Sequence, residues 1–350
     1  MESLFDLVSA ANVVAYWIEK NVNEQPMLGE TLFPAQKEIG IKLDWIKGAK
    51  NQPIGLRLSA YDAKAIRRDR KGIEEYATTM PFFKESKYID EDMRQKLNTL
   101  LGNNSNSALV NALIQKIFDD QIELIKAAYV SLERMRMEAL TEGTITLSSN
   151  GQSYSYDYGV PADQKATATV DWSDPDADII EDINNIKDAM KAKGVTITRA
   201  ICNQSVAKYF AKNKNIKNSI YVLAGGSIAS ISTARALSYV QEETGIVFYV
   251  YDNVYVDDNG DAVKYIKDNL VVFLPDGTLG ETHFGTTPEE SDLMAGSNAA
   301  DVSIVDSGIA VTTYGTVDPV NKEMKVSMVA LPSFERANEV YIFEVVETTI

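Results

Sequence analysis

Histidine and cysteine are nearly absent from this 350-residue chain, which contains only His283 and Cys202. A single cysteine cannot form a disulfide within the chain, so no disulfide framework can hold the fold together. A single histidine excludes a metal site with two histidine ligands, including the paired histidines of a metalloprotease helix. Nucleophile–histidine catalysis could use only His283, which lies in a polar stretch between Gly280 and Gly285. We therefore expect a structural role for His283 and a buried thiol at Cys202.

Long apolar runs and net positive charge are absent as well. No stretch approaches ~18 consecutive apolar residues, so the sequence predicts no membrane-spanning helix. No basic residues precede the apolar stretch near the N-terminus, which is therefore not a secretory signal, and we expect a cytoplasmic protein. The chain has 34 Lys and Arg against 50 Asp and Glu, a formal net charge of −16. Because cations must neutralise the phosphates of bound nucleic acid, this balance favours a chain that lies near DNA without adhering to it.

Signatures of phosphate, calcium and carboxylate chemistry are incomplete. Residues 224–227 are glycine-rich but lack the lysine and the spacing of nucleotide-binding loops. Residues 257–261, DDNGD, lack the distal glutamate of a calcium loop and are typical of a hairpin turn. The acidic residues leave a carboxylate-dependent polysaccharide hydrolase open as an alternative, although no local pattern favours any pair. The sequence thus predicts no catalytic, metal-binding or cofactor-binding residues, and a protein that is not an enzyme.

The N-terminal region predicts a helix followed by an extended arm. Apolar residues recur at helical spacing on one side of the first twenty residues, namely Leu4, Leu7, Val8, Ala11, Ala15 and Ile18. Residues 21–40 show no period and are interrupted by prolines and glycines, which favours an extended arm. At about 100–200 residues per domain, the length allows two or three domains, or one large domain with extensions. Hydrophobic residues make up 45% of the chain, enough to bury a sizeable core.

Residues 41–84 predict a long two-stranded hairpin. Apolar and polar residues alternate from Ile39 to Trp45, and residues 73–77 and 81–84 form the expected return strand. Residues of about 49–71 would then form a flexible tip. Because an isolated hairpin is marginally stable in water, we expect another molecule to support it.

The tip of this predicted hairpin is basic, although the chain is acidic. Residues 47–71 contain eight cationic and two acidic residues, a local charge of +6 that leaves −22 for the rest of the chain. The predicted inter-subunit contact residues are Lys47, Lys50, Arg57, Lys64, Arg67, Arg68, Arg70 and Lys71. We interpret them as a segment that docks on an acidic surface of another copy, with a solvated loop as the alternative. DNA binding is disfavoured because Tyr61 is the one aromatic residue available for stacking on bases.

A long helix is predicted over residues 105–141, which contain no glycine or proline. Its apolar residues form a broad stripe, so two sides of the helix are expected to be covered. Ser105 or Ser107 can cap the start, and Gly143 is suited to end the helix. About 36 residues at 1.5 Å each would give a helix of roughly 54 Å.

The rest of the chain predicts a mixed α/β body. Residues 144–172 alternate in polarity, and Asn150-Gly151 predicts a hairpin turn. Helices are expected over 177–193 and 205–212. Strands are expected over 196–201, 246–255 and 270–274, and within the tail segments 309–317, 322–334 and 339–347.

The order and spacing of these segments resemble those of a tailed-bacteriophage major capsid protein, closest to the lambda-type major capsid protein E family. The resemblance is carried by IGIKLDWIKGAK, YDYGVPADQKATATVDW, FYVYDNVYVDDNG, NLVVFLPDGTLGETHFGTTPEE and VALPSFERANEVYIFEV. It implies the α+β Hong Kong 97 phage capsid fold. The expected parts are an N-arm (1–40), an E-loop (41–90), a peripheral domain (91–178) with spine helix 105–141, an axial domain (179–310) with mixed α/β structure, and return strands to the peripheral domain (311–350).

The resemblance also implies a function. A protein of this family is expected to self-assemble, as hexamers and pentamers, into an icosahedral head shell around packaged double-stranded DNA, without sequence-specific binding, catalysis, cofactors or a membrane. Its expected partners are copies of itself, a portal and a decoration protein. A separate scaffolding protein is expected because Met1 leads almost directly into the N-arm. The expected location is the virion, with assembly in the bacterial host cytoplasm. An encapsulin-like compartment shell and another virion part, such as a tail protein, are the alternatives.

Overall fold

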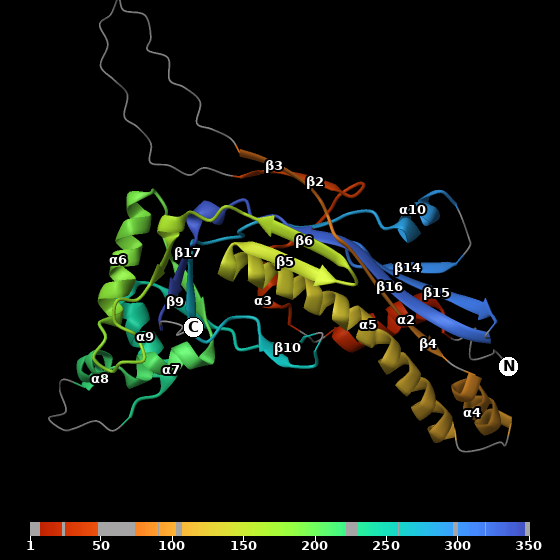
Figure 1. Ribbon diagram of the computed structural model, residues 1–350. Coiled ribbons are helices and arrows are strands. Elements are labelled where there is room, and N and C mark those ends of the chain that lie inside the picture. The colour runs from red at the N-terminus through yellow and green to blue at the C-terminus, as the bar shows by residue number, and fades with distance from the viewer. Residues whose placement is uncertain are drawn as a thin grey trace, which may run out of the picture. The chain divides into compact units, whose positions relative to one another are not determined.

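The computed structural model describes residues 8–22, 25–47, 74–89, 91–102, 107–221, 230–257, 259–296, 300–318 and 320–346 (Figure 1). The chain forms two compact units. The first unit contains Met1–Asp44, Ala77–Arg136 and Glu281–Ser333, and the second contains Trp45–Tyr76, Met137–Gly280 and Phe334–Ile350. No helix within the described residues is long and apolar enough to cross a membrane.

The first unit is built on a six-stranded sheet. Its strands are β1 (Ala35–Lys37), β4 (Phe82–Ile89), β13 (Thr282–Phe284), β14 (Asp301–Val305), β15 (Ile309–Val317) and β16 (Val320–Pro332). The order is β1-β13-β16-β15-β14, and β4 pairs with β16 as well. Strand β16 has 13 residues, so one side can pair with β15 while the other pairs with β4 and then β13.

Five helices are assigned to the described part of the first unit. They are α2 (Ala10–Asn21), α3 (Leu28–Leu32), α4 (Glu91–Gly102), α5 (Ser107–Glu142) and α10 (Pro288–Met294), of which α5 continues into the second unit. Helix α5 has 36 residues and confirms the predicted long helix. Gly143 ends it with a φ of +74°, and the Gly143 N–H donates to the Ala139 carbonyl at 3.0 Å. Helix α4 was not predicted.

The N-terminal predictions are partly wrong. Helix α2 exists, but it buries Ala10, Val13 and Trp17, whereas Ile18 is 58% exposed. Trp17 offers the largest apolar area on the helix, so the side of the helix that carries Trp17 packs inward. The predicted side, which carries Ile18, therefore faces outward. The arm predicted as extended contains α3, and β1 pairs in parallel with β13 of the sheet.

The predicted hairpin is confirmed only at its base. Strands β2 (Lys42–Lys47) and β3 (Glu74–Thr79) form a two-stranded sheet. Residues 82–84, predicted to continue the return strand, instead pair with β16 as part of β4. The predicted tip, 49–71, lies outside the described residues.

The second unit is built on a five-stranded sheet. Its strands, in spatial order, are β7 (Lys165–Thr167), β17 (Tyr341–Glu344), β12 (Leu270–Leu274), β8 (Arg199–Cys202) and β9 (Val247–Val250). Its helices are α6 (Ile179–Ala192), α7 (Gln204–Lys212), α8 (Lys214–Tyr221) and α9 (Thr233–Thr244), with short 3-10 turns at Ala162–Gln164 and Ala337–Glu339. The core includes Trp172, Phe210 and Phe273, which are at most 1% exposed.

Two hairpins complete the second unit. Strands β5 (Thr144–Ser149) and β6 (Gln152–Asp157) are joined by Asn150 and Gly151, whose φ angles of 49° and 74° confirm the predicted turn. Strands β10 (Val254–Val256) and β11 (Ala262–Lys264) pair antiparallel. The strand predicted over 246–255 is therefore two strands, because the chain leaves the sheet after β9.

The two compact units group the chain differently from the predicted arm, loop and domain ranges, which stay predictions. Residues 281–310, predicted as axial, fall in the first unit because β13 pairs with β16 and β14 pairs with β15. The end of the chain falls in the second unit because β17 pairs with β12. Strand pairing between distant segments therefore decides which parts of the chain belong to each unit.

Candidate assembly surfaces

A buried polar network fixes the N-terminal segment to helix α5 in the first unit. Glu133 is fully buried, and its Oε1 accepts from the Gly29 N–H at 2.9 Å. Arg136, one turn further along α5, donates from Nε to the Thr282 hydroxyl at 2.9 Å. That hydroxyl donates in turn to the Phe33 carbonyl at 2.8 Å. Helix α5 therefore joins α3 to β13, and the segment beginning at α3 leaves from a fixed base.

Gly29 is a residue that the sequence reasoning missed. A Cβ atom here would lie 2.5 Å from Glu133 Oε2 and 2.9 Å from Arg136 Cβ, so a side chain cannot fit without displacing this pair. The available sequence signal was Pro26 and Gly29 in a stretch without periodicity. That signal indicates a break in regular structure but not a close approach to a distant helix.

Two buried glutamates at the start of α10 hold this helix against the sheet. Glu289 forms an ion pair with Lys325 of β16 and accepts from the Ser327 hydroxyl at 2.8 Å. Glu290 accepts from Lys37 Nζ at 2.6 Å. Burial raises the pKa of Glu289, but the hydrogen bonds from Lys325, from backbone and from Ser327 outweigh it, so the net pKa is lowered. The carboxylate therefore stays charged and bonded near neutral pH.

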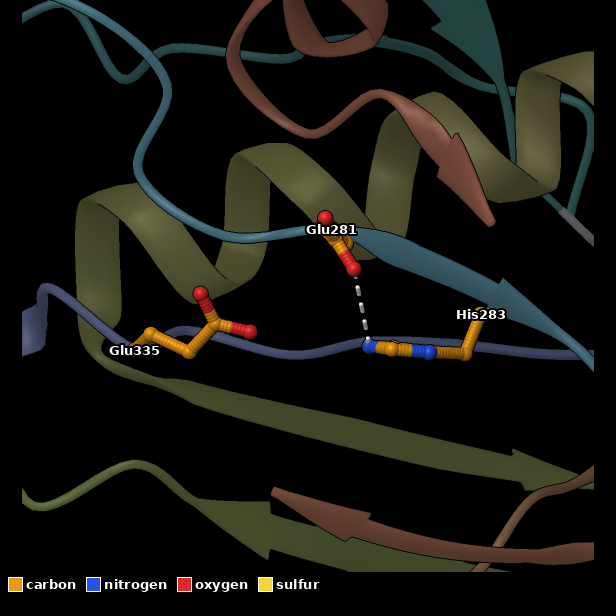
Figure 2. Close-up of side chains that lie close together, drawn as sticks. All are labelled: Glu281, His283 and Glu335. Atoms are coloured by element: carbon orange, nitrogen blue, oxygen red, sulfur yellow. Dashed lines mark ion pairs between the residues drawn. The ribbon is translucent and has the colours of Figure 1, made fainter. Parts of the chain in front are cut away.

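His283 lies on β13 rather than in a polar loop, and it is 6% exposed. Its Nδ1 is 3.2 Å from Glu38 Oε1, and its Nε2 is 3.1 Å from the Ser333 hydroxyl. Figure 2 shows the imidazole beside the Glu281 carboxylate, where Nε2 and Oε2 are 4.0 Å apart. The ring thus bridges segments of the first unit, as a structural histidine does. Glu335, also drawn in Figure 2, belongs to the second unit, and we assign no metal site to the group.

Among the described residues, neither Cys202 nor the turn at residues 257–261 belongs to a catalytic arrangement. Burial raises the pKa of the fully buried Cys202 thiol to about 12, which confirms the predicted buried thiol. The Asp257 carboxylate accepts from the backbone N–H groups of Asn259 and Asp261 at 2.9 Å, which confirms the predicted turn. The glycine-rich residues 224–227 lie outside the described residues.

Of the eight predicted basic contact residues, the structure describes Lys47 alone. Lys47 is 6% exposed, and its Nζ donates to the Gly159 carbonyl at 2.6 Å within the second unit. The ammonium group of Lys47 is thus used inside its own subunit, and its predicted inter-subunit contact stays a prediction. The remaining members of the set, Lys50 to Lys71, lie outside the described residues.

A groove of about 280 Å³ runs beside β4 in the first unit. Residues 86–89 of β4 form one wall, and Ile117, Asp120 and Gln121 of α5 form the other, with Met93 at one end. Among the described residues, β4 pairs with β16, so the groove lies along its other edge. The charged residues in the lining are Lys87, which forms an ion pair with Glu123, and Asp120. The lining is therefore a strand edge of mixed polarity.

The profile of the family described as phage major capsid protein E matches residues 9–345. The chain belongs to this family. No curated protein matches the sequence.

Solved structures support the same fold. A protein described as a prophage capsid protein of Escherichia coli CFT073 superimposes with a TM-score of 0.61 at 14% identity, covering 97% of this chain and 99% of that one. A phage-related protein from Bordetella bronchiseptica RB50 gives a TM-score of 0.53 at 11% identity, covering 97% of each chain. The α+β fold is thus that of the Hong Kong 97-type capsid proteins, as predicted.

The family membership settles the broad function. This capsid protein forms shells by association of its own copies and is a virion component, as the sequence resemblance implied. The family is one of structural proteins. The encapsulin-like alternative is weaker, because the profile that matches is that of phage capsid proteins.

Proposed function

We propose that this capsid protein builds an icosahedral head of hexamers and pentamers around packaged double-stranded phage DNA. The observation that carries the proposal is the match of the phage capsid profile to residues 9–345, nearly the whole chain. A shell of this kind is held by many weak contacts acting together rather than by one strong pair.

The charge of the chain supports a container for DNA. A formal net charge of −16 disfavours adhesion to phosphates, so DNA can be enclosed without sequence-specific binding and can later leave. We further propose a separate scaffolding protein, a portal and a decoration protein as partners, and assembly in the cytoplasm of the bacterial host. The proposed role of the chain is structural, and it includes no catalysed reaction.

The basic segment is proposed as an inter-subunit contact. Lys50, Arg57, Lys64, Arg67, Arg68, Arg70 and Lys71 would dock on an acidic surface of a neighbouring copy. Exposed ion pairs contribute only about 0–1 kcal/mol each, but their repetition around a shell adds up.

Reversing three of these charges tests the contact. The variant with Arg67→Glu, Arg68→Glu and Arg70→Glu should give fewer particles in sedimentation, while circular dichroism shows an unchanged soluble fold. Raising the salt concentration should weaken assembly of the unmodified chain, because the Debye length at physiological salt is about 8 Å.

The matched control reverses Lys191 (Lys191→Glu), an exposed lysine of α6, with Lys187 excluded because it donates to the Thr244 carbonyl. Lys193 is excluded as well, because it follows the helix and forms an ion pair with Asp163. Normal particle yield from the triple arginine variant would show that these charges are ordinary solvated surface. Misfolding of that variant would show that the segment packs on its own subunit.

A further inference from the structure

Strands β10 and β11 form a rigid ribbon in the second unit. Tyr265 packs against Tyr255 with ring centroids 4.9 Å apart and against Tyr251 at 6.0 Å, with the rings tilted in both pairs. The turn between the strands is closed by Asp257, whose carboxylate accepts from two backbone N–H groups. Aromatic contacts and a closed turn therefore fix the ribbon in one conformation before any partner arrives.

The ribbon presents an apolar face to solvent. Val254 is 56% exposed and Val256 is 66% exposed, and alternation along the strand places both on the side opposite Tyr255. The neighbouring strand β9 exposes Tyr249 and Val250 and lies last in the order of its sheet. Four exposed large apolar residues within eight positions, beside a sheet edge, are typical of a contact surface.

Charges of opposite sign mark the two ends of helix α7. The ribbon segment 252–261 contains four aspartates and no lysine or arginine, and three of these aspartates lie in the described residues. Segment 204–221, which forms α7 and α8, contains four lysines and no acidic residue. Part of this charge is used within the copy, because Asp252 pairs with Lys264 of β11 and Lys214 pairs with Asp176. The charges that remain for a partner include Asp261 on the ribbon and Lys212 and Lys217 on the helices.

The two charged ends face away from each other within one copy. The Gln204 N–H at the start of α7 donates to Asp252 at 3.2 Å, so the ribbon lies beside the beginning of this helix. Lys212 ends α7, about 12 Å further along at 1.5 Å per residue, and α8 continues from Lys214. Figure 1 shows β10 and α8 on opposite sides of α7. The ribbon is therefore placed to meet the lysines of another copy.

We propose that the β10–β11 ribbon of one copy docks on the lysine-bearing end of α7 and on α8 of a second copy. The contact is head to tail, with Val254 and Val256 at its centre and Asp261 opposite Lys212 and Lys217 at its margin. A contact between two different surfaces repeats from copy to copy and closes into a ring when the rotation allows. The inference rests on the proposed shell, because it names one contact that the shell would use.

Cysteine cross-linking of the full chain tests the geometry. The variant with Val256→Cys and Asn215→Cys joins two exposed positions outside the charged set, and the buried Cys202 should not react. Treatment of assembled particles with a short bis-maleimide should give a ladder of dimers, trimers and higher species on a denaturing gel. A mixture of the two single-cysteine variants should stop at dimers, because each copy then has one reactive end.

The matched control pairs Val256→Cys with Glu181→Cys on the exposed surface of α6 and should give no ladder. Particles that form normally but give no ladder with the first pair would overturn this inference and leave the shell intact. Absence of particles from the unmodified chain would contradict the shell and this contact with it.

A charge swap gives an independent readout. Asp261→Lys should lower particle yield about tenfold, and Lys212→Glu with Lys217→Glu should do the same, because like charges then meet. The combination of all three changes should recover most of the yield. Equal yields from all four proteins, or no recovery in the combination, would contradict the proposed pairing.

Discussion

Single side chains decide how the first unit holds its N-terminal segment. Glu133 of α5 accepts from the backbone of Gly29 in α3, and Arg136 donates to Thr282 in β13. Because Gly29 has no side chain, both of these α5 side chains fit beside it. The pair is buried, so loss of one partner leaves an uncompensated charge rather than a solvated one. The contact is therefore sensitive to changes as small as a methyl group.

Gly29→Ala should lower the free energy of unfolding by about 1–3 kcal/mol, since a Cβ would overlap Glu133 and Arg136. Urea denaturation measures this change. Gly315→Ala is the control, because its Cβ would meet only a backbone oxygen at 3.9 Å and should cost far less. Equal stability of the two variants would contradict the described packing around Gly29.

Glu289→Gln should make stability less dependent on pH. The folded pKa of Glu289 lies below its usual value of 4.5, so its contribution is present above that value and is lost as the pH falls through the folded pKa. We expect a loss of about 1–3 kcal/mol at neutral pH that shrinks towards zero in acid. Urea denaturation at several pH values checks this, with exposed Glu242→Gln as a control that should change neither quantity.

Local sequence signals predicted some of these residues and not others. Gly143 and Asn150-Gly151 were predicted correctly because a positive φ is a property of a few neighbouring residues. The bonds of Glu133 and His283 could not be predicted, because their partners lie 104 and 245 positions away. Distant pairing depends on the tertiary fold, which a single sequence pattern does not encode.

Helix α5 is the element on which the first unit is organised. Its uninterrupted apolar stripe gave the correct extent to within about two residues, the usual uncertainty of helix ends. Helix α4 was missed, although Glu91 and Asp92 in the first turn and an ion pair between Asp92 and Lys96 are typical helix signals. Strand β4 was assigned to the wrong partner because a strand pattern does not identify its neighbour.

Leu124→Asp should abolish particle formation and yield aggregated protein. Leu124 is 6% exposed on α5, so the variant would bury an unpaired carboxylate. Ala127→Asp, at an exposed position of the same helix, is the control and should assemble normally. The soluble yield and the sedimenting fraction of both variants are the measurements. Normal assembly of Leu124→Asp would show that this side of the helix is not packed.

At the level of the whole molecule, the resemblance predicted the family and the fold, but the boundaries of the two compact units came from the structure. Strand β4 pairs with β16 across more than two hundred residues, and β7 pairs with β17 across 177 residues. Each unit is therefore built from three segments that lie far apart in the sequence. Composition and spacing along the sequence cannot show which distant segments return to the same sheet.

The shell itself is the central claim, and electron microscopy of the full chain tests it most directly. The protein would be expressed in bacteria with its scaffolding partner, fractionated by sedimentation and imaged. We predict closed, uniform shells with five-fold and six-fold clusters of subunits in the fast-sedimenting fraction. Folded protein that remains in small oligomers under these conditions, with no closed particle, would contradict the account.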